Sequence, residues 1–185
     1  KTEIYVQLIQ SYLDLGKQVL FLLPEIALTT QLIQRLSIYF GDQIGVYHSK
    51  FNQNERVEIW NKVLANDPQQ YRLIIGARSA VFLPYQDLGL IIVDEEHESS
   101  FKQYDPSPRY NARDASIILG NHHQAKVLLG TATPAMETYY NAKSGKFGLV
   151  ELNEPYKGLR LPEILCADLK KERRQKDNQS HFSGI

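Results

Sequence analysis

The sequence has few of the residues that hold small secreted or metal-stabilised proteins together. Its 185 residues include a single cysteine, Cys166. One cysteine excludes a disulfide within the chain and a zinc site built from several cysteines. We therefore expect no zinc in this segment and a reducing compartment such as the cytoplasm.

Long hydrophobic runs and a charge imbalance are also missing. No apolar stretch approaches the roughly 18 to 20 residues that a membrane span requires, and no secretory signal opens the chain, so we expect a soluble protein with no membrane partner. Lys plus Arg and Asp plus Glu balance at 21 each. Without a net positive field, any site for a polyanion must be a local patch.

Hydrophobic residues make up 43% of the chain, enough for one core, and they recur in short runs. Nearly continuous apolar runs are typical of buried parallel strands, and there are five: Gln18–Leu23, Ile44–His48, Arg72–Gly76, Leu88–Val93 and Lys126–Gly130. Helical spacing marks the stretches between them: Ile4–Leu15, Leu28–Phe40, Glu55–Leu64 and Arg113–Gly120. The alternation predicts an α/β fold, a parallel sheet flanked by helices.

Two segments fall outside this alternation. Ser99–Tyr110 mixes aromatic, basic and proline residues and predicts a long loop, which in a compact domain is more often functional than idle. Residues 170–185 are polar and charged and predict a frayed helix or a tail. Helical spacing in apolar surroundings predicts core positions for four large side chains: Trp60, Met136, Tyr139 and Tyr140.

An acidic cluster follows the fourth apolar run. Asp94, Glu95 and Glu96 are adjacent and precede His97. In open α/β sheets ligands bind beyond the carboxyl ends of the strands, where this cluster falls. A divalent cation relieves the repulsion between carboxylates, and Mg²⁺ commonly binds one or two of them together with phosphate oxygens. Taken alone, the cluster is more simply explained as a solvated acidic turn.

The first two residues supply the other half of a phosphate site. Lys1 and Thr2 precede a helical stretch, and the phosphate-binding loop GxxxxGK[ST] ends in these residue types at the start of a helix. There the lysine reaches the β and γ phosphates and the hydroxyl ligates Mg²⁺. Alone, the pair carries almost no information.

Together, six segments resemble the successive motifs of superfamily 2 helicases of the DEAH type, and more narrowly the bacterial DNA helicases of replication restart. They are KTE at 1–3, LLPEIALTTQL at 22–32, GARSAVFLP at 76–84, IIVDEEHESSFKQ at 91–103, RYNARD at 109–114 and LLGTATPAMET at 128–138. The resemblance covers most of residues 1–169, and the order and spacing of the segments argue against chance.

The resemblance implies a RecA-like, P-loop NTPase fold for residues 1–169, the first of two motor domains, with residues 170–185 leading toward the second. It implies that Lys1 and Thr2 end a P-loop whose glycines and preceding strand are missing here. Because that strand belongs inside the sheet, we expect an exposed edge beside Lys126–Gly130 or a gap, and possible self-association. The implied cofactors are ATP and Mg²⁺.

Catalytic roles follow from the resemblance. Asp94 would hold Mg²⁺, with Thr2 as a further metal ligand, and Glu95 would polarise the water that attacks the γ-phosphate. Lys1 and His97 would complete the ATP site.

The resemblance implies that His97, Thr131 and Thr133 couple the state of the bound nucleotide to DNA binding. The structural alternative is an ordinary surface or capping histidine, with threonines that end a strand and cap a helix.

Two segments are expected to contact single-stranded DNA. Arg78 and Ser79 follow a glycine turn at a strand end and suit phosphate contacts, although Arg78 could instead form a surface ion pair. The loop interleaves aromatic and basic side chains, a combination suited to sequence-tolerant binding: Phe101, Lys102, Tyr104, Arg109, Tyr110 and Arg113. Alternatively, Phe101 and Tyr110 anchor the loop to the core. The DPSP stretch at 105–108 departs from the shorter glycine-containing loop expected of the family.

The implied function is that of a motor domain in an ATP-dependent 3′-to-5′ DNA helicase acting in replication restart and primosome assembly. Its partners would be single-stranded and forked DNA, other primosome proteins and single-stranded DNA-binding protein. The chain alone is expected to bind ATP weakly and not to hydrolyse it. Two alternatives remain open: a weak single-stranded DNA-binding module without ATPase activity, and a metal-dependent hydrolase built on the acidic cluster, for which the sequence offers no second group of metal ligands.

Overall fold

The computed structural model describes residues 1–48 and 51–152, and its strands and helices alternate along the chain. The strands are β1 (Gln18–Leu22), β2 (Ile44–Tyr47), β3 (Leu73–Gly76), β4 (Leu88–Asp94) and β5 (Lys126–Gly130). The helices are α1 (Thr2–Asp14), α2 (Thr30–Phe40), α3 (Gln53–Ala65), α4 (Ala112–His123) and α5 (Met136–Lys143). The predicted tail at 170–185 lies outside the described residues.

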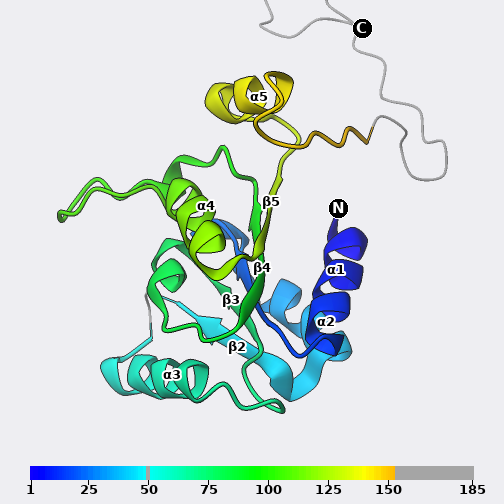
Figure 1. The fold of residues 1–185 in the computed structure, drawn as a ribbon. Coiled ribbons are helices and arrows are strands. Elements are labelled where there is room, and N and C mark those ends of the chain that lie inside the picture. Colours follow the sequence, from blue (N-terminus) through cyan, green and yellow to red (C-terminus); the bar gives the residue numbers. More distant parts are fainter. Residues whose placement is uncertain (49–50, 153–185) are drawn as a thin grey trace, which may run out of the picture. The chain divides into compact units, whose positions relative to one another are not determined.

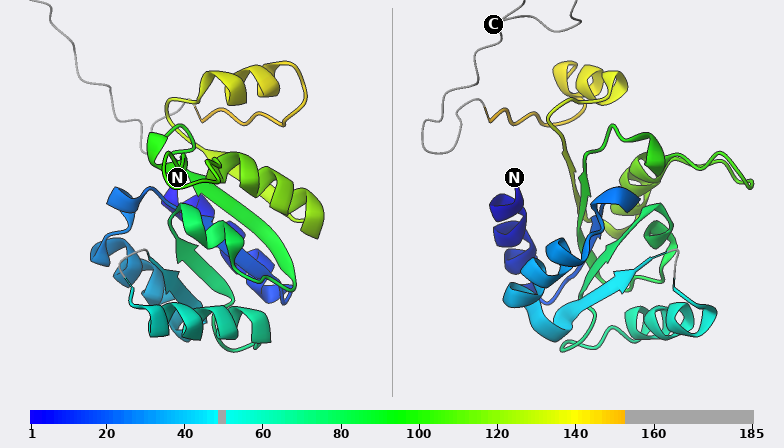
Figure 2. Two further views of the ribbon diagram at one scale, coloured as in Figure 1. Left: turned by 90° about the vertical axis from the view of Figure 1, so that its left-hand side faces the viewer. Right: turned by 180° about the vertical axis from the view of Figure 1, so that it is seen from behind.

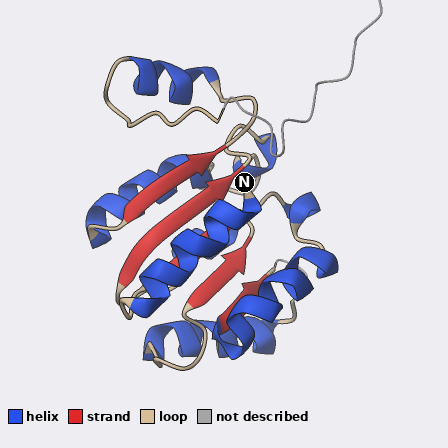
Figure 3. Ribbon diagram, turned by 90° about the vertical axis from the view of Figure 1, so that its right-hand side faces the viewer, coloured by secondary structure: helices blue, strands red, loops and turns tan. Residues whose placement is uncertain are grey.

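All strands pair in parallel in one sheet of order β2-β3-β1-β4-β5. Figure 3 shows their arrowheads pointing to the same end of the sheet. Each predicted strand is confirmed, with ends shifted by a residue at most. The reason is burial on both faces, since every residue of β1 and β3 is buried.

The sheet separates two apolar cores, and helices cover both of its faces (Figure 1). Residues of β1 alternate between them, as successive side chains on a strand must. Leu20 and Leu22 pack on the side covered by α3 and α4, whereas Val19 and Phe21 pack on the side covered by α1 and α2. This two-sided packing confirms the predicted RecA-like class of sheet with flanking helices.

Strand β5 lies at one end of the sheet, next to β4. None of its residues is fully buried, in contrast to β1 and β3. The expected sheet edge at 126–130 is therefore confirmed. An edge strand presents unpaired backbone groups to other chains.

The prediction of core positions for Trp60, Met136, Tyr139 and Tyr140 is wrong. Trp60 is 45% exposed and Met136 85% exposed, and both tyrosines are exposed as well. Helix α3 turns only Ile59 and Val63 into the core, and α5 has no buried residue. Helical spacing identifies an apolar stripe but does not determine whether the stripe meets the sheet.

Residues Lys1–Lys146 form one compact unit. Among the described residues, no helix is both long enough and apolar enough to cross a membrane.

Candidate functional site

The acidic cluster lies at the end of an interior strand. Asp94 is the last residue of β4, which pairs with β1 on one side and β5 on the other. Lys1 precedes α1, and Figure 3 places the N-terminus at the end of the sheet to which the arrowheads point. The two halves of the predicted site therefore meet at the carboxyl ends of the strands.

Lys1 binds both of the predicted catalytic carboxylates. Its Nζ donates to Glu95 Oε1 at 2.5 Å and lies 3.5 Å from Asp94 Oδ1. The hydroxyl of Tyr5, one turn into α1, donates to the same Asp94 oxygen at 2.8 Å. Thr2 begins α1 between these two residues. The start of the chain is thus joined to the end of β4 by three polar contacts.

The pKa values of Lys1 and Tyr5 reflect this environment. Burial lowers the pKa of Lys1, but the hydrogen bond to Glu95 and the charges of Asp94 and Glu95 outweigh it and raise the pKa above its usual value. Burial raises the pKa of the Tyr5 hydroxyl well above its usual value, and the hydrogen bond to Asp94 adds to the shift. Lys1 stays cationic and Tyr5 stays a hydrogen-bond donor at neutral pH.

Backbone geometry at the site is constrained at two positions. Glu95 has φ +50°, a left-handed conformation that is uncommon for a residue other than glycine and costs about 1–3 kcal/mol. Gly130, which pairs with Asp94 across β4 and β5, faces Tyr5 so closely that a Cβ there would overlap the Tyr5 hydroxyl. Only glycine leaves room for the contact between Tyr5 and Asp94.

His97 lies between the two threonines with which it was predicted to act. Its Nδ1 is 2.8 Å from Thr131 Oγ1, and its Nε2 is 3.3 Å from Thr133 Oγ1. Thr131 Oγ1 also accepts a hydrogen bond from the Thr133 backbone N–H at 3.0 Å. The structure thus brings these three residues together, while their part in coupling stays a prediction.

Glu96 is a functional candidate that sequence reasoning missed. Its side chain is 0% exposed and pairs with Arg113, Nη1 to Oε2, at 3.3 Å. It also accepts hydrogen bonds from the Ala135 backbone N–H at 2.7 Å and from Thr138 Oγ1 at 2.9 Å. The only sequence signal was its place in a run of acids, which gives no information about burial.

Two of the three arginines predicted to contact DNA, Arg78 and Arg113, make internal contacts. Arg78 lies in a short turn, Arg78–Phe82, next to the partly exposed Ser79, and its Nη1 donates to the Lys102 carbonyl at 3.0 Å. Arg113 is held between Glu96 and Asp114, and its side chain is largely buried. In this conformation both arginines support the loop, and their contact with DNA stays a prediction.

The loop itself divides into an anchored base and an exposed tip. Lys102 forms an antiparallel bridge with Asn111, and its Nζ donates to the Arg109 carbonyl at 2.6 Å. Tyr104, near the tip, is 66% exposed, and Figure 1 shows this segment projecting between the short turn before it and α4.

Phe101 and Tyr110 occupy the base of the loop. Phe101 is 1% exposed and belongs to the core on the α3 and α4 side. Tyr110 packs edge-on against Phe82, with 4.7 Å between ring centroids, and against the same core. Burial therefore favours the anchoring interpretation for Phe101, whereas Tyr104 and Arg109 are exposed and available to a ligand.

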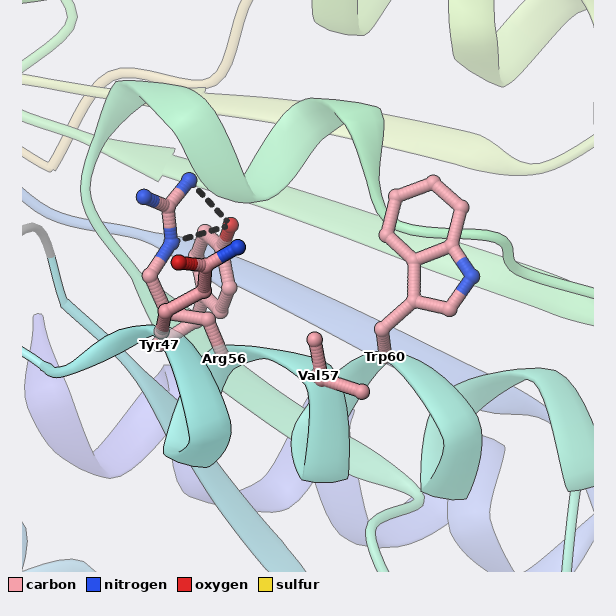
Figure 4. A pocket seen from close by; sticks show the side chains of 5 residues that line it. Tyr47, Arg56, Val57 and Trp60 are labelled. Carbon is pink, nitrogen blue, oxygen red and sulfur yellow. Dashed lines mark hydrogen bonds between the residues drawn. The ribbon is translucent and has the colours of Figure 1, made fainter.

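A separate open hollow of about 400 Å³ lies beside α3. Tyr47, Arg56, Val57 and Trp60 line it together with Gln53, and Figure 4 shows the Arg56 guanidinium directed at the Tyr47 hydroxyl. None of the predicted site residues lines this hollow.

The donor set suits a metal held jointly with phosphates better than a metal held by protein alone. Among residues 1–48 and 51–152, no group of three His, Cys, Asp or Glu side chains could hold a metal ion. The Asp94 carboxylate beside a lysine ammonium fits Mg²⁺, which keeps water and phosphate ligands and needs only one or two carboxylates.

Comparison with known proteins gives consistent results. The family model described as DEAD/DEAH box helicase matches residues 1–142. The replication restart protein PriA of Bacillus subtilis (strain 168) is 42% identical over 183 residues, which are 99% of this chain and 22% of that protein. PriA of Rickettsia felis is 43% identical over 178 residues, which are 96% of this chain and 27% of that protein. The chain thus spans about a quarter of the length of these relatives.

Among solved structures, RecG bound to a three-way DNA junction matches with a TM-score of 0.45 and 21% identity, over 70% of this chain and 16% of RecG.

Proposed function

The chain belongs to the DEAD/DEAH box helicase family, and from this we propose that it is a motor domain of an ATP-dependent DNA helicase that acts in replication restart. The contact that carries the proposal is the meeting of Lys1 with Asp94 and Glu95 at the end of β4. A phosphate-seeking cation and two carboxylates at the carboxyl ends of parallel strands suit phosphoryl transfer.

Each residue of the site has a distinct task in this proposal. Lys1 orients the β and γ phosphates of ATP. When its ammonium group contacts these phosphates, it gives up the hydrogen bond to Glu95. Asp94, fixed by Tyr5, holds Mg²⁺ together with the Thr2 hydroxyl. Bound Mg²⁺ would neutralise charge on the phosphates. Glu95 orients the attacking water and accepts its proton.

The proposed substrates are single-stranded and forked DNA. The motor is proposed to move along the DNA in the 3′-to-5′ direction. Tyr104 and Arg109 are the exposed loop residues that suit base stacking and phosphate contact. The name of the relatives, replication restart protein, supports a role in replication restart. The further proposed partners are other primosome proteins and single-stranded DNA-binding protein, and the proposed compartment is the bacterial cytoplasm.

A chimera tests the proposal. This chain replaces the matching segment of the Bacillus subtilis relative, and ATP turnover is measured with and without single-stranded DNA. We expect turnover that DNA stimulates, and faster displacement of a strand from forks with a 3′ single-stranded arm than from forks with a 5′ arm. Absence of DNA-stimulated turnover would reject the motor, and the opposite fork preference would reject the direction.

The second candidate is a DNA-binding module without turnover, favoured by the exposed tip of the loop. Titration of the 185-residue chain with a labelled oligonucleotide at several salt concentrations distinguishes the two. The DNA-binding module is supported if the 185-residue chain binds the oligonucleotide in a salt-sensitive way and the chimera hydrolyses no ATP.

A further inference from the structure

Glu96 is an acid in an unusual position, because its carboxylate is removed from water. Burying a carboxylate is costly unless it is paired and fully hydrogen-bonded. Here both oxygens are used: Oε1 accepts from Ala135, and Oε2 accepts from Thr138 and pairs with Arg113. The main effect of the buried Glu96 carboxylate is therefore to join the segments that carry its partners, and its net contribution to stability is secondary.

The partners of Glu96 come from two separate segments. Arg113 lies in the first turn of α4, two residues after Asn111, which pairs with Lys102 at the base of the loop. Ala135 and Thr138 lie at the start of α5, soon after the threonines that contact His97.

The backbone of Glu96 adds a third connection. Its N–H donates to the Gly130 carbonyl at 3.2 Å, at the end of β5. Glu96 is also the residue between Glu95 and His97 in the chain. A displacement of its carboxylate therefore acts on the turn that carries the proposed water-orienting residue.

We propose that Glu96 is a positioning residue that couples the base of the 102–111 loop to the 131–138 segment. A shift of Arg113 moves the Glu96 carboxylate, which in turn moves Ala135, and with it Thr133 two residues earlier, relative to His97. The effect on ATP turnover rests on the proposed function, whereas the mechanical coupling does not.

Hydrogen exchange of the 185-residue chain tests the coupling directly. Arg113→Ala removes the contact between Glu96 and the base of the loop. Within the described part of the chain, Arg113 contacts Asn111, Asp114 and Glu96 and makes no hydrogen bond to residues 131–138. We expect amides of residues 131–138 to exchange about tenfold faster, the factor that corresponds to roughly one lost charge-assisted hydrogen bond. Thr138→Ala should, in the reverse direction, accelerate exchange at the base of the loop.

Asp114→Ala is the matched control. Asp114 is the exposed second partner of Arg113, so its loss should leave both segments unchanged. Exchange that rises only in the segment where each substitution lies would overturn the proposal. The outcome does not depend on the folding of a Glu96 variant, because each substitution changes a partner residue and leaves Glu96 in place.

Turnover of the chimera gives the second readout. Glu96→Gln should lower the ratio of DNA-stimulated to basal ATP turnover, and an unchanged ratio would overturn the proposed coupling. A chimera with the native Glu96 that shows no DNA-stimulated turnover would instead reject the proposed function, and the exchange experiment would still decide the role of Glu96.

Discussion

The ammonium group of Lys1 lies 2.5 Å from Glu95 Oε1, so the beginning of the chain is bound to the turn that follows β4. The cation proposed to bind phosphate is thus held by the carboxylate proposed to orient water. Binding of ATP would exchange this ion pair for a lysine contact with phosphate, which leaves Glu95 free to act.

The ion pairs of Lys1 should contribute little to stability. The Lys1 and Glu95 side chains are 33% and 34% exposed, and exposed ion pairs are worth about 0 to 1 kcal/mol. Lys1→Ala should therefore change the free energy of unfolding in urea by less than about 1 kcal/mol, while it abolishes nucleotide binding by the chimera. Lys17→Ala is the control, because it removes a similar surface pair with Asp87. That variant should lose equally little stability and bind nucleotide normally.

The raised pKa of Tyr5 predicts that the folded protein loses stability at alkaline pH. Its folded-state pKa is raised above the usual value, so the unfolded chain loses the phenolic proton first. The resulting stabilisation is complete below about pH 10, the pKa of an unfolded tyrosine, and is lost as the pH rises toward the folded pKa. Urea unfolding between about pH 9 and 11 should show this decline, and Tyr5→Phe should make it shallower. An equally steep decline in Tyr5→Phe would contradict the assignment. Burial also raises the pKa values of Tyr85 and Tyr110, and both tyrosines contribute to the remaining slope.

The loop offers a matched pair of aromatic substitutions. Tyr104→Ala should weaken single-stranded DNA binding by about 1–3 kcal/mol, the value of one stacked base, without a change in unfolding. Phe101→Ala should lower the free energy of unfolding by about 3–5 kcal/mol, because it empties a core site. Oligonucleotide titration and urea unfolding measure the two effects. Equal DNA affinity in Tyr104→Ala and the native chain would exclude stacking at the tip.

The open edge of β5 predicts self-association of the 185-residue chain. Unpaired edge groups recruit further strands, and β5 is the last strand beside β4 in the described sheet. Sedimentation equilibrium should show an average mass that rises with concentration. Amides of Lys126–Gly130 should gain protection over the same range, whereas those of the central β1 should not change. A single monomeric species throughout would contradict this prediction.

The fold was predictable because burial on both faces leaves a simple pattern. A run such as Leu88–Val93 is apolar at nearly every position, which is typical of a strand buried on both faces of a parallel sheet. Trp60 could not be placed in the same way. Its spacing in α3 fits a core position, but the buried face of α3 carries Ile59 and Val63 and leaves Trp60 exposed.

The proximity of Lys1 to Asp94 and Glu95 was predictable, but the contacts that support these residues were not. The order of the motifs along the chain predicted that Lys1, Asp94 and Glu95 lie at one end of the sheet. Glu96 could not be distinguished from its acidic neighbours in the sequence, because burial of its side chain depends on Arg113 and on the start of α5. Phe101 was ambiguous for the same reason, since the same ring suits a core or a stacked base.

The most direct test of the account is the rate of DNA-stimulated ATP turnover by the chimera carrying Glu95→Gln. Loss of a general base predicts a fall of about 10²- to 10⁴-fold with retained nucleotide binding, whereas Glu98→Gln, a nearby exposed acid, should turn over ATP at the native rate. Turnover by Glu95→Gln as fast as by the native chimera would show that the residue bound to Lys1 is not the catalytic carboxylate.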